Sequence, residues 1–365
     1  MEQCSNETMA GIVIINTCAV TGKAEKEVRQ MIRRVKRENP ECFLVVTGCW
    51  IDNIKNKKLN IKNTNKKLKI LENIDLVAGN EDKMRIGEIL GRRFSLRHIK
   101  DGPLYEDKYF KSKKALVKIQ DGCVNFCTYC IVPYLRGRSR SRPADEIIEE
   151  VREKVEQGIR GVVLTGVDIA SYKFEARNSK FETNLKSKYL NSKQFSNRAI
   201  KQSNNDLVKL LKLILAETKI EKISFGSVNL DSFDNELIDF FSNHKSRITN
   251  HFHISLQSGC NTTLKRMNRK YTIKEYKEVI KKLREEIPNV VFSTDVMVGF
   301  PGETEEEFEE SFKNIKEIGF AKLHVFRYSP REGTLAVKMS DKWGKIPEKV
   351  KMERAKKIRG LIGKK

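Results

Sequence analysis

The stretch ALVKIQDGCVNFCTYC, residues 115–130, joins a short apolar run to three closely spaced cysteines. The run ALVKI (115–119) is typical of a strand, and five similar runs follow it. Helical stretches separate the runs, as in a parallel α/β fold. The six repeats therefore predict a partial (β/α)6 barrel with its functional groups at the carboxyl ends of the strands. The later runs lie at 161–165, 222–226, 251–255, 290–298 and 321–326, and the helical stretches at 143–157, 206–217, 233–243, 272–286 and 304–318.

A smaller α/β domain is expected before the barrel. GIVIIN (11–16) and FLVVT (43–47) flank a charged helical stretch at 22–38, which is a strand–helix–strand pattern. We expect a small parallel, flavodoxin-like sheet that is incomplete. The predicted organisation is this N-terminal domain at 1–92, a linker at 93–113, the barrel domain at 114–345 with a Lys- and Asn-rich insertion at 173–205, and a final helix at 346–365.

The cysteines of the opening stretch have the spacing C-x3-C-x2-C, at Cys123, Cys127 and Cys130. Three thiolates on one short loop can hold three irons of a [4Fe–4S] cluster, and the fourth iron then stays open to another ligand. Zinc is the alternative metal, but a structural zinc takes four ligands and no fourth Cys or His lies nearby. Plain structural cysteines are the other alternative.

Two further cysteines each follow a predicted strand. Asn16-Thr17-Cys18 ends the first strand and Thr47-Gly48-Cys49 ends the second. Because the carboxyl ends of parallel strands meet at one edge of a sheet, Cys18 and Cys49 are expected to emerge together and to suit a second metal site. The alternative is a pair of ordinary buried cysteines.

The net charge of the 365-residue chain is +23, which suits a polyanionic partner such as RNA or DNA. A compositional preference for Lys and Asn is the alternative explanation. No run reaches the length of a membrane span, and the N-terminus is neither basic nor apolar, so we expect neither an integral membrane protein nor a secretory signal. The cysteines are then most simply cytoplasmic thiols.

Four arginines follow the cysteine loop with no acidic residue between them, and a guanidinium suits phosphate. These candidate RNA contacts are Arg136, Arg138, Arg140 and Arg142. The alternative is that some of them pair with carboxylates. The strand histidines His251, His253 and His324 are interpreted as core residues with satisfied hydrogen bonds.

The cysteine spacing resembles that of the radical S-adenosylmethionine (SAM) superfamily, in which the open iron binds SAM and an electron from the cluster cleaves it to a 5′-deoxyadenosyl radical. The resemblance implies that Cys123, Cys127 and Cys130 are the catalytic cluster ligands. It further implies SAM contacts at strand ends and in a GFPGET motif. The implied contacts are Tyr129, Thr165, Gly166, Asp168, Ser227, Gly299, Gly302 and Glu303.

Over most of residues 11–355 the chain resembles the methylthiotransferases, radical SAM enzymes whose N-terminal domain carries an auxiliary [4Fe–4S] cluster. The resemblance lies in segments such as NTCAVTGKA (16–24), RGRSRSRP (136–143), NHFHISLQSG (250–259) and LKRMNRKYT (264–272). The branch acting on N6-threonylcarbamoyladenosine in tRNA is the most similar. The resemblance assigns Cys18 and Cys49 to the auxiliary cluster.

Three departures from this family stand out. The family's first auxiliary cysteine, in a Gly-Cys-x-x-Asn turn, has no counterpart, and Cys4 stands in a different context. The family's C-terminal RNA-binding TRAM domain is also missing, so we expect a chain truncated at both ends. Asn229 stands where the family often has a SAM-contacting Glu.

The resemblance implies methylthiolation at C2 of N6-threonylcarbamoyladenosine at position 37 of tRNA, beside the anticodon. The implied partners are the tRNA anticodon arm and an electron donor such as flavodoxin or ferredoxin. One rival is a methylthiotransferase acting on isopentenyladenosine in tRNA or on a ribosomal protein. The other is a truncated, non-catalytic RNA-binding iron–sulfur protein.

Overall fold

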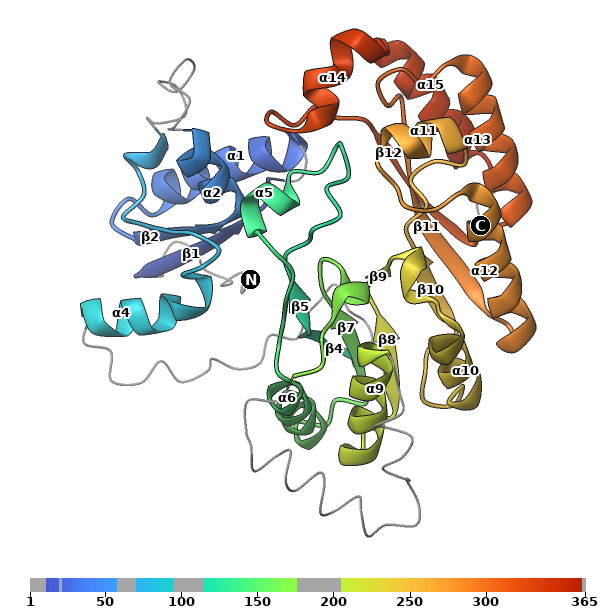
Figure 1. Cartoon of the computed structure of the whole chain (residues 1–365). Coiled ribbons are helices and arrows are strands. Elements are labelled where there is room, and N and C mark those ends of the chain that lie inside the picture. Colours follow the sequence, from blue (N-terminus) through green and yellow to red (C-terminus); the bar gives the residue numbers. More distant parts are fainter. Residues whose placement is uncertain (1–10, 20–21, 58–69, 95–113, 176–204, 363–365) are drawn as a thin grey trace. The chain divides into compact units, whose positions relative to one another are not determined.

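The computed structural model describes residues 11–19, 22–57, 70–94, 114–175 and 205–362 (Figure 1). The chain forms two compact units. Most of the predicted linker at 93–113 and of the predicted insertion at 173–205, together with Cys4, lies outside the described residues. Unit 1 comprises Met1–Tyr109, Cys130–Arg136 and Ser329–Thr334, and unit 2 comprises Phe110–Tyr129, Gly137–Tyr328 and Leu335–Lys365.

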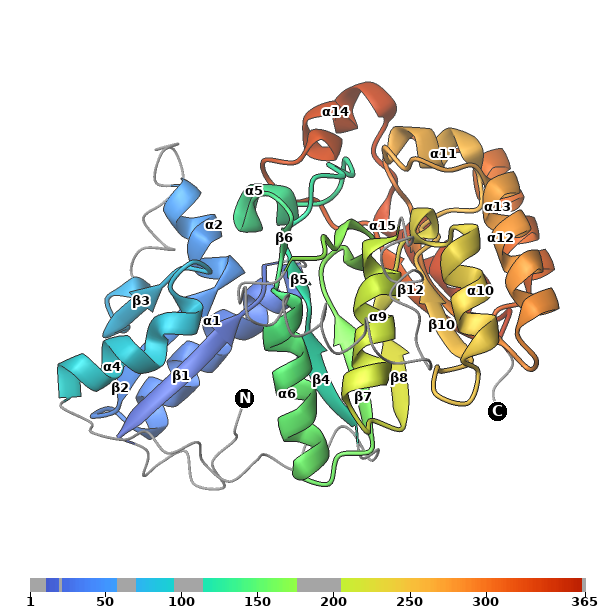
Figure 2. The same ribbon diagram turned by 60° about the horizontal axis from the view of Figure 1, so that its bottom comes forward.

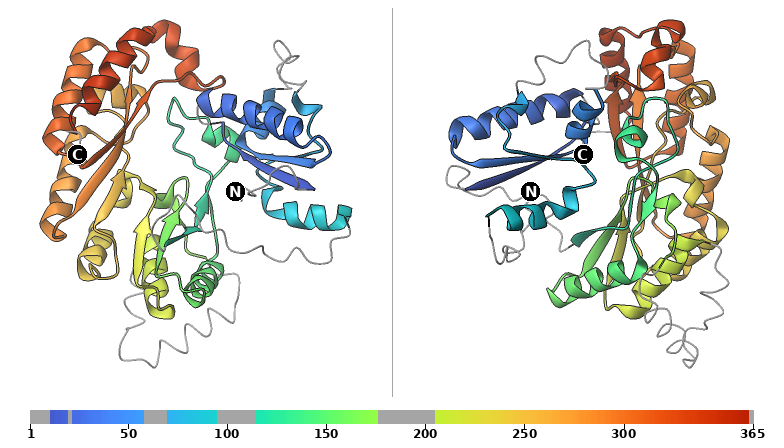
Figure 3. Two further views of the ribbon diagram at one scale, coloured as in Figure 1. Left: turned by 180° about the vertical axis from the view of Figure 1, so that it is seen from behind. Right: turned by 60° about the vertical axis from the view of Figure 1, so that its left-hand side comes forward.

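Unit 1 is built on a parallel sheet with strand order β1-β2-β3. The strands are β1 (Ile12–Thr17), β2 (Phe43–Gly48) and β3 (Leu76–Ala78), and the helices are α1 (Gly22–Glu38), α2 (Cys49–Lys57), the short η2 (Lys83–Arg85) and α4 (Ile86–Phe94). Side chains alternate across the sheet, so Leu44 and Val46 pack with α1 and α2 while Val45 packs with α4. Figure 3 shows α1 and α4 on opposite faces of this sheet.

Two short segments from far along the chain complete unit 1. Helix α5 (Val132–Arg136), with the preceding Ile131, adds Ile131 and Leu135 to the same apolar cluster as α1 and α2. The buried Arg331 donates to the Ala19 carbonyl and pairs with Glu25 at 3.2 Å. The predicted domain bounds place both segments in the barrel domain, because those bounds follow chain order. In the structure, buried contacts hold the two segments in unit 1.

Unit 2 is a partial barrel of six parallel strands that follow one another in chain order. They are β4 (Lys114–Lys118), β7 (Gly161–Thr165), β8 (Lys222–Phe225), β10 (His251–Ile254), β11 (Val291–Val298) and β12 (Lys322–Arg327). The sheets β4-β7-β8 and β12-β11-β10-β9 meet through a parallel bridge between Ile223 and Ile248, just before β10. The predicted α/β class with a partial (β/α)6 barrel is confirmed.

Amphipathic helices cover the barrel strands and bury one continuous apolar core (Figure 2). Thr272 and Thr304 cap two of these helices through reciprocal capping boxes with Glu275 and Glu307. The helices are α6 (Ala144–Glu156), α9 (Asp206–Glu217), α10 (Asn235–Asn243), α12 (Ile273–Glu286), α13 (Glu305–Ile318) and, at the predicted final helix, α15 (Glu348–Arg359). No helix of the described residues is long and apolar enough to cross a membrane.

Several short elements have no periodic sequence signal and were not predicted. In unit 2 the most important is the antiparallel pair β5 (Gln120–Asp121) and β6 (Arg140–Ser141), which closes the cysteine loop. The others in unit 2 are β9 (Ser227–Val228), η3 (Ile169–Ser171), η4 (Leu230–Ser232), α11 (Asn261–Arg266) and α14 (Leu335–Trp343).

The ion pair between Glu303 and Arg354 fastens α15 to the barrel. Their charged atoms lie 2.7 Å apart, and the side chains are 2% and 6% exposed. Arg354→Met leaves the Glu303 carboxylate buried without this partner, which we expect to cost about 3–5 kcal/mol of unfolding free energy in urea titrations. Lys356→Met, an exposed site on α15, is the control and should change little. A cost for Arg354→Met as small as that of the control would contradict this role.

Candidate cluster and cofactor site

The cysteine loop of unit 2 begins at Gly122, which has φ +75°. A Cβ on Gly122 would lie 2.0 Å from the Arg138 carbonyl oxygen, so only glycine fits this close approach. The next residue, Cys123, donates its backbone N–H to the Gly137 carbonyl at 3.1 Å. Its Sγ in turn accepts the backbone N–H of Asn125 at 3.4 Å. The loop thus presents a cysteine sulfur that already accepts a backbone hydrogen bond, as cluster ligands do.

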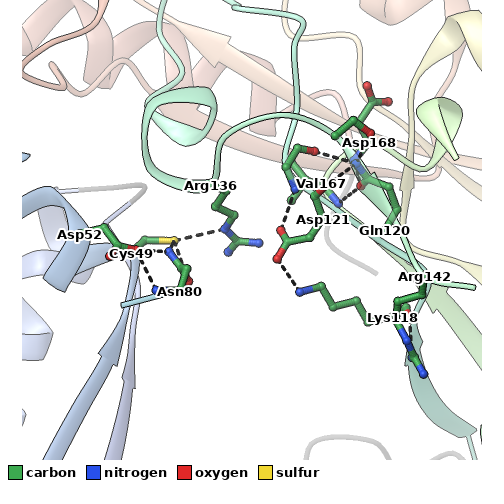
Figure 4. A network of polar contacts seen from close by, with 12 residues as sticks. Cys49, Asp52, Asn80, Lys118, Gln120, Asp121, Arg136, Arg142, Val167 and Asp168 are labelled. Carbon is green, nitrogen blue, oxygen red and sulfur yellow. Dashed lines mark hydrogen bonds and ion pairs between the residues drawn. The ribbon is translucent and has the colours of Figure 1, made fainter. Parts of the chain in front are cut away.

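Gln120 joins this loop to the end of β7. Its side-chain Nε2 donates to the Gly122 carbonyl at 2.7 Å, and its Oε1 accepts the backbone N–H groups of Val167 and Asp168 at 2.9 and 2.8 Å (Figure 4). A Cβ on Gly166 would lie 2.9 Å from the same Oε1. The buried Gln120 amide therefore fixes the loop against the turn that carries Asp168. Sequence reasoning missed Gln120, because a lone glutamine has no spacing signal.

Asp168 is the centre of a second network in unit 2. Its carboxylate accepts the side-chain amides of Asn125 at 2.9 Å and of Asn229 at 2.8 Å, and it lies 3.9 Å from Cys123 Sγ. Asn229, the residue that departs from the family pattern, thus has a defined partner. The predicted SAM contact Asp168 is 4% exposed, and in this structure it orients the cysteine loop.

Arg269 was not singled out from the sequence, although its segment carries part of the family resemblance. Its Nη1 donates to Cys127 Sγ at 3.5 Å and its Nη2 to the Ser255 carbonyl at 3.2 Å. Its Nε donates to the Tyr271 hydroxyl, and burial raises the pKa of Tyr271 to about 12. A small cavity of about 20 Å³ lies here, lined by Asn125, Cys127, Asn229, Asp231, Asn268, Arg269, Lys270 and Tyr271.

The predicted GFPGET contacts lie at the end of β11, where they pack against α14 and α15. A Cβ on Gly299 would lie 2.3 Å from Lys351 Cγ, and one on Gly302 would lie 2.7 Å from the Trp343 carbonyl oxygen. Glu303 accepts the Gly299 N–H at 2.6 Å. Burial raises the pKa of Glu303, although this hydrogen bond and Arg354 lower it.

The remaining predicted SAM contacts lie on the loop and at strand ends. Tyr129 makes an edge contact with Phe300, with ring centroids 6.5 Å apart, and so packs the loop onto the barrel. Thr165 ends β7, and its carbonyl accepts the Ile119 N–H. Ser227 is exposed in β9, opposite His253 in the register with β10. The structure brings Asp168 to Cys123, whereas Glu303 belongs to the α15 contact.

In unit 1, Cys18 and Cys49 follow two residues that are directly paired, Thr17 in β1 and Gly48 in β2. The two cysteines therefore follow neighbouring strands at the same edge of the sheet. The axes of such strands lie about 4.8 Å apart. Cys18 is exposed and Cys49 is buried, and neither forms a disulfide. Thiolates are the ligands of iron–sulfur clusters, so the donor chemistry of these two residues fits such a site.

The four loop arginines have different surroundings. Arg136 donates its Nε to Cys49 Sγ at 3.2 Å within unit 1 (Figure 4). Arg142 pairs with Glu150 at 2.6 Å and donates to the Lys118 carbonyl in unit 2. Arg138 and Arg140 are exposed on either side of Ser139.

The prediction that the strand histidines are core residues is wrong, because His251 is exposed and His253 and His324 are half-buried. Ser293 Oγ bonds both His251 Nε2 and His253 Nδ1, at 2.9 and 3.0 Å, and His253 Nε2 lies 3.2 Å from Asp295. Burial lowers the pKa of His251 and of His324. The three possible metal ligands His253, Asp295 and His324 lie within 4.8 Å of one another, and His324 Nδ1 lies 3.6 Å from Asp295.

Gly122→Ala should distort the cysteine loop. A positive φ costs a residue with a Cβ about 1–2 kcal/mol, and at Gly122 the clash with the Arg138 carbonyl adds to that cost. Gly158 also has a positive φ, of +80°, but has open space around it, so Gly158→Ala is the matched control. We expect a larger loss of unfolding free energy and of bound iron after reconstitution in Gly122→Ala. Equal losses in the two variants would argue against the close approach.

The raised pKa of Tyr271 predicts a dependence of stability on alkaline pH. Above about pH 10 the unfolded chain releases the phenol proton that the folded chain keeps until about pH 12. The unfolding free energy therefore falls as pH rises through this window, and Tyr271→Phe lacks this contribution. Urea titrations at several pH values should show the difference between wild type and variant shrinking from about pH 10 upward. A difference that stays constant to pH 12 would contradict the shift.

Comparisons with known proteins follow the same division of the chain. The family model of the radical SAM superfamily matches residues 117–315, and that of the uncharacterized protein family UPF0004 matches residues 1–70. The threonylcarbamoyladenosine tRNA methylthiotransferase MtaB of Bacillus subtilis (strain 168) is 33% identical over 97% of this chain and 72% of its own length. The MtaB of Aquifex aeolicus (strain VF5) is 34% identical over 100% and 82%.

The tRNA-2-methylthio-N(6)-dimethylallyladenosine synthase of Geobacillus thermodenitrificans (strain NG80-2) is 34% identical over 97% of this chain, which spans 63% of that protein. Among solved structures, the radical S-adenosylmethionine methyltransferase TsrM of Kitasatospora setae shares the fold, with a TM-score of 0.56 and 12% identity over 91% of this chain and 65% of that one. The chain belongs to the radical SAM superfamily and, within it, to the methylthiotransferase family of enzymes.

Proposed function

We propose that this chain adds a methylthio group to C2 of N6-threonylcarbamoyladenosine at position 37 of tRNA. The observation that supports this proposal most is that cysteines follow strand ends in both units: Cys18 and Cys49 follow β1 and β2, and Cys123 lies beyond β4. Two sulfur sites match a reaction that needs both a radical and a source of sulfur. The MtaB names of two relatives support this substrate.

Membership of the superfamily implies a [4Fe–4S] cluster and SAM, which together supply a 5′-deoxyadenosyl radical when bound. Cys123, Cys127 and Cys130 are the proposed ligands of that cluster. Gln120 and Asp168 hold the loop that carries the first two of these thiols. The residues proposed to surround SAM are Tyr129, Thr165, Gly166, Ser227, Gly299, Gly302 and Glu303.

A second, auxiliary [4Fe–4S] cluster on Cys18 and Cys49 is the proposed sulfur source. Two thiolates leave room for a further ligand, which a substitute group would provide. Arg136 Nε and Asn80 Nδ2 contact Cys49 Sγ as hydrogen-bond donors and are not metal ligands. They can stabilise a sulfur-rich group on this thiolate.

The proposed partner is the anticodon arm of tRNA, consistent with the net charge of +23. Arg138 and Arg140 are exposed and are the proposed phosphate contacts among the four loop arginines. An electron donor such as flavodoxin or ferredoxin and a cytoplasmic location complete the proposal. The second candidate substrate is dimethylallyladenosine in tRNA, because a tRNA-2-methylthio-N(6)-dimethylallyladenosine synthase is equally similar to this chain, at 34% identity.

Cys127→Ala should abolish SAM cleavage and leave any cluster on Cys18 and Cys49 intact, because it removes one of the three ligands of the radical site. Cys260→Ala is the control, since Cys260 is buried at the start of α11 and outside both sites. The measurements are 5′-deoxyadenosine release and iron content after anaerobic reconstitution. Cleavage retained in Cys127→Ala would contradict the radical site.

The substrate is tested by nucleoside mass spectrometry of tRNA from cells with and without the gene. Appearance of the 2-methylthio form of threonylcarbamoyladenosine supports the proposal. Methylthiolation of dimethylallyladenosine alone would replace this substrate with the second candidate.

The iron content after reconstitution tests the auxiliary cluster. About eight irons per chain indicate two clusters and about four indicate one, so the iron count decides whether the auxiliary cluster assembles.

A further inference from the structure

In each candidate cluster site, an arginine donates a hydrogen bond to a cysteine sulfur. In unit 1 Arg136 Nε lies 3.2 Å from Cys49 Sγ. In unit 2 Arg269 Nη1 lies 3.5 Å from Cys127 Sγ. Because each contact lies within one unit, the two observations are independent of each other.

Arg136 is placed by the end of α5, whose Leu135 is buried in the apolar cluster of unit 1. Cys49 receives a second hydrogen bond from Asn80 Nδ2 at 3.5 Å. Asp52 holds Asn80 in place by accepting both its backbone N–H at 3.1 Å and its side-chain amide (Figure 4). The buried Cys49 sulfur therefore lies in a fixed shell of donors.

Arg269 is placed by contacts on every side of its guanidinium. It donates to the Ser255 carbonyl and to Asn229 Oδ1, and its guanidinium carbon lies 4.9 Å from the centre of the Tyr271 ring. A guanidinium keeps its positive charge even when it is buried, so Arg269 is cationic beside Cys127.

Hydrogen bonds to cluster sulfurs and nearby positive charge both favour the reduced form of an iron–sulfur cluster, because reduction adds negative charge. A guanidinium provides both effects at once and keeps its charge when buried. Arg136 and Arg269 thus supply what each site needs to accept an electron more readily.

We propose that Arg136 and Arg269 are positioning residues that raise the reduction potentials of the auxiliary and the radical cluster, respectively. The inference rests on the proposed function, which places the clusters on these cysteines. Arg136, a candidate RNA contact from the sequence, thus belongs to the auxiliary site instead. Neither arginine touches the reacting atoms in this role, since each acts through a cysteine sulfur.

The test is a potentiometric titration, followed by electron paramagnetic resonance, of anaerobically reconstituted full-length chain. Arg136→Gln should shift only the auxiliary cluster to a more negative midpoint potential, and Arg269→Gln only the radical cluster. Each variant is thereby the control for the other. Arg138→Gln, two residues beyond Arg136 and exposed, should shift neither. Arg136→Lys and Arg269→Lys keep the charge but not the planar fork, so we expect smaller shifts.

Unchanged potentials in glutamine variants with full iron content would overturn the inference. Loss of iron from both the lysine and the glutamine variant at one position would also overturn it there, in favour of a role in cluster assembly. If the wild-type chain binds only about four irons, the auxiliary cluster does not form, and the role proposed for Arg136 is overturned with it. The reduction potential of the remaining cluster still tests the role proposed for Arg269. Failure of the inference and failure of the proposed function are therefore distinguishable.

Discussion

The barrel site depends on one buried side-chain amide, that of Gln120. Its two polar atoms bond the cysteine loop at Gly122 and the turn before Asp168, and the residue is 1% exposed. A buried amide must have its donors and acceptor satisfied, so the loop and the turn are held in one relative position. Asp168 then orients Asn125 within the loop and Asn229 beyond β8.

Both units place their candidate sulfur ligands near the carboxyl ends of parallel strands. A parallel strand ends, the chain turns, and a cysteine follows at the sheet edge where the strand carboxyl ends gather. The structure provides N–H donors at two of these sulfurs, from Arg136 and Asn80 at Cys49 and from Arg269 at Cys127, whereas Cys123 Sγ lies 3.9 Å from the Asp168 carboxylate. Such N–H donors stabilise thiolates and the clusters they bind.

Much of the fold was predictable because it is periodic. The six strand runs and the main helices of the barrel appear within a few residues of the predicted ranges, and the α/β class is confirmed. The elements that were missed, such as β5, β6 and α5, are two to five residues long and too short to show a period. The cysteine spacing indicated the cluster chemistry, whereas the residues that support the loop had no local signal.

The sequence by itself determined the strand and helix pattern, the cysteine spacing and the family resemblance, since each is a relation between near neighbours in the chain. Only the tertiary structure decided that Arg136 contacts Cys49, that Arg269 contacts Cys127 and that Glu303 pairs with Arg354. These partners lie tens of residues apart or more, and a charged side chain has no preferred partner until folding has removed water from around it. The hydrogen bonds that orient the candidate sites are therefore a property of the packed chain.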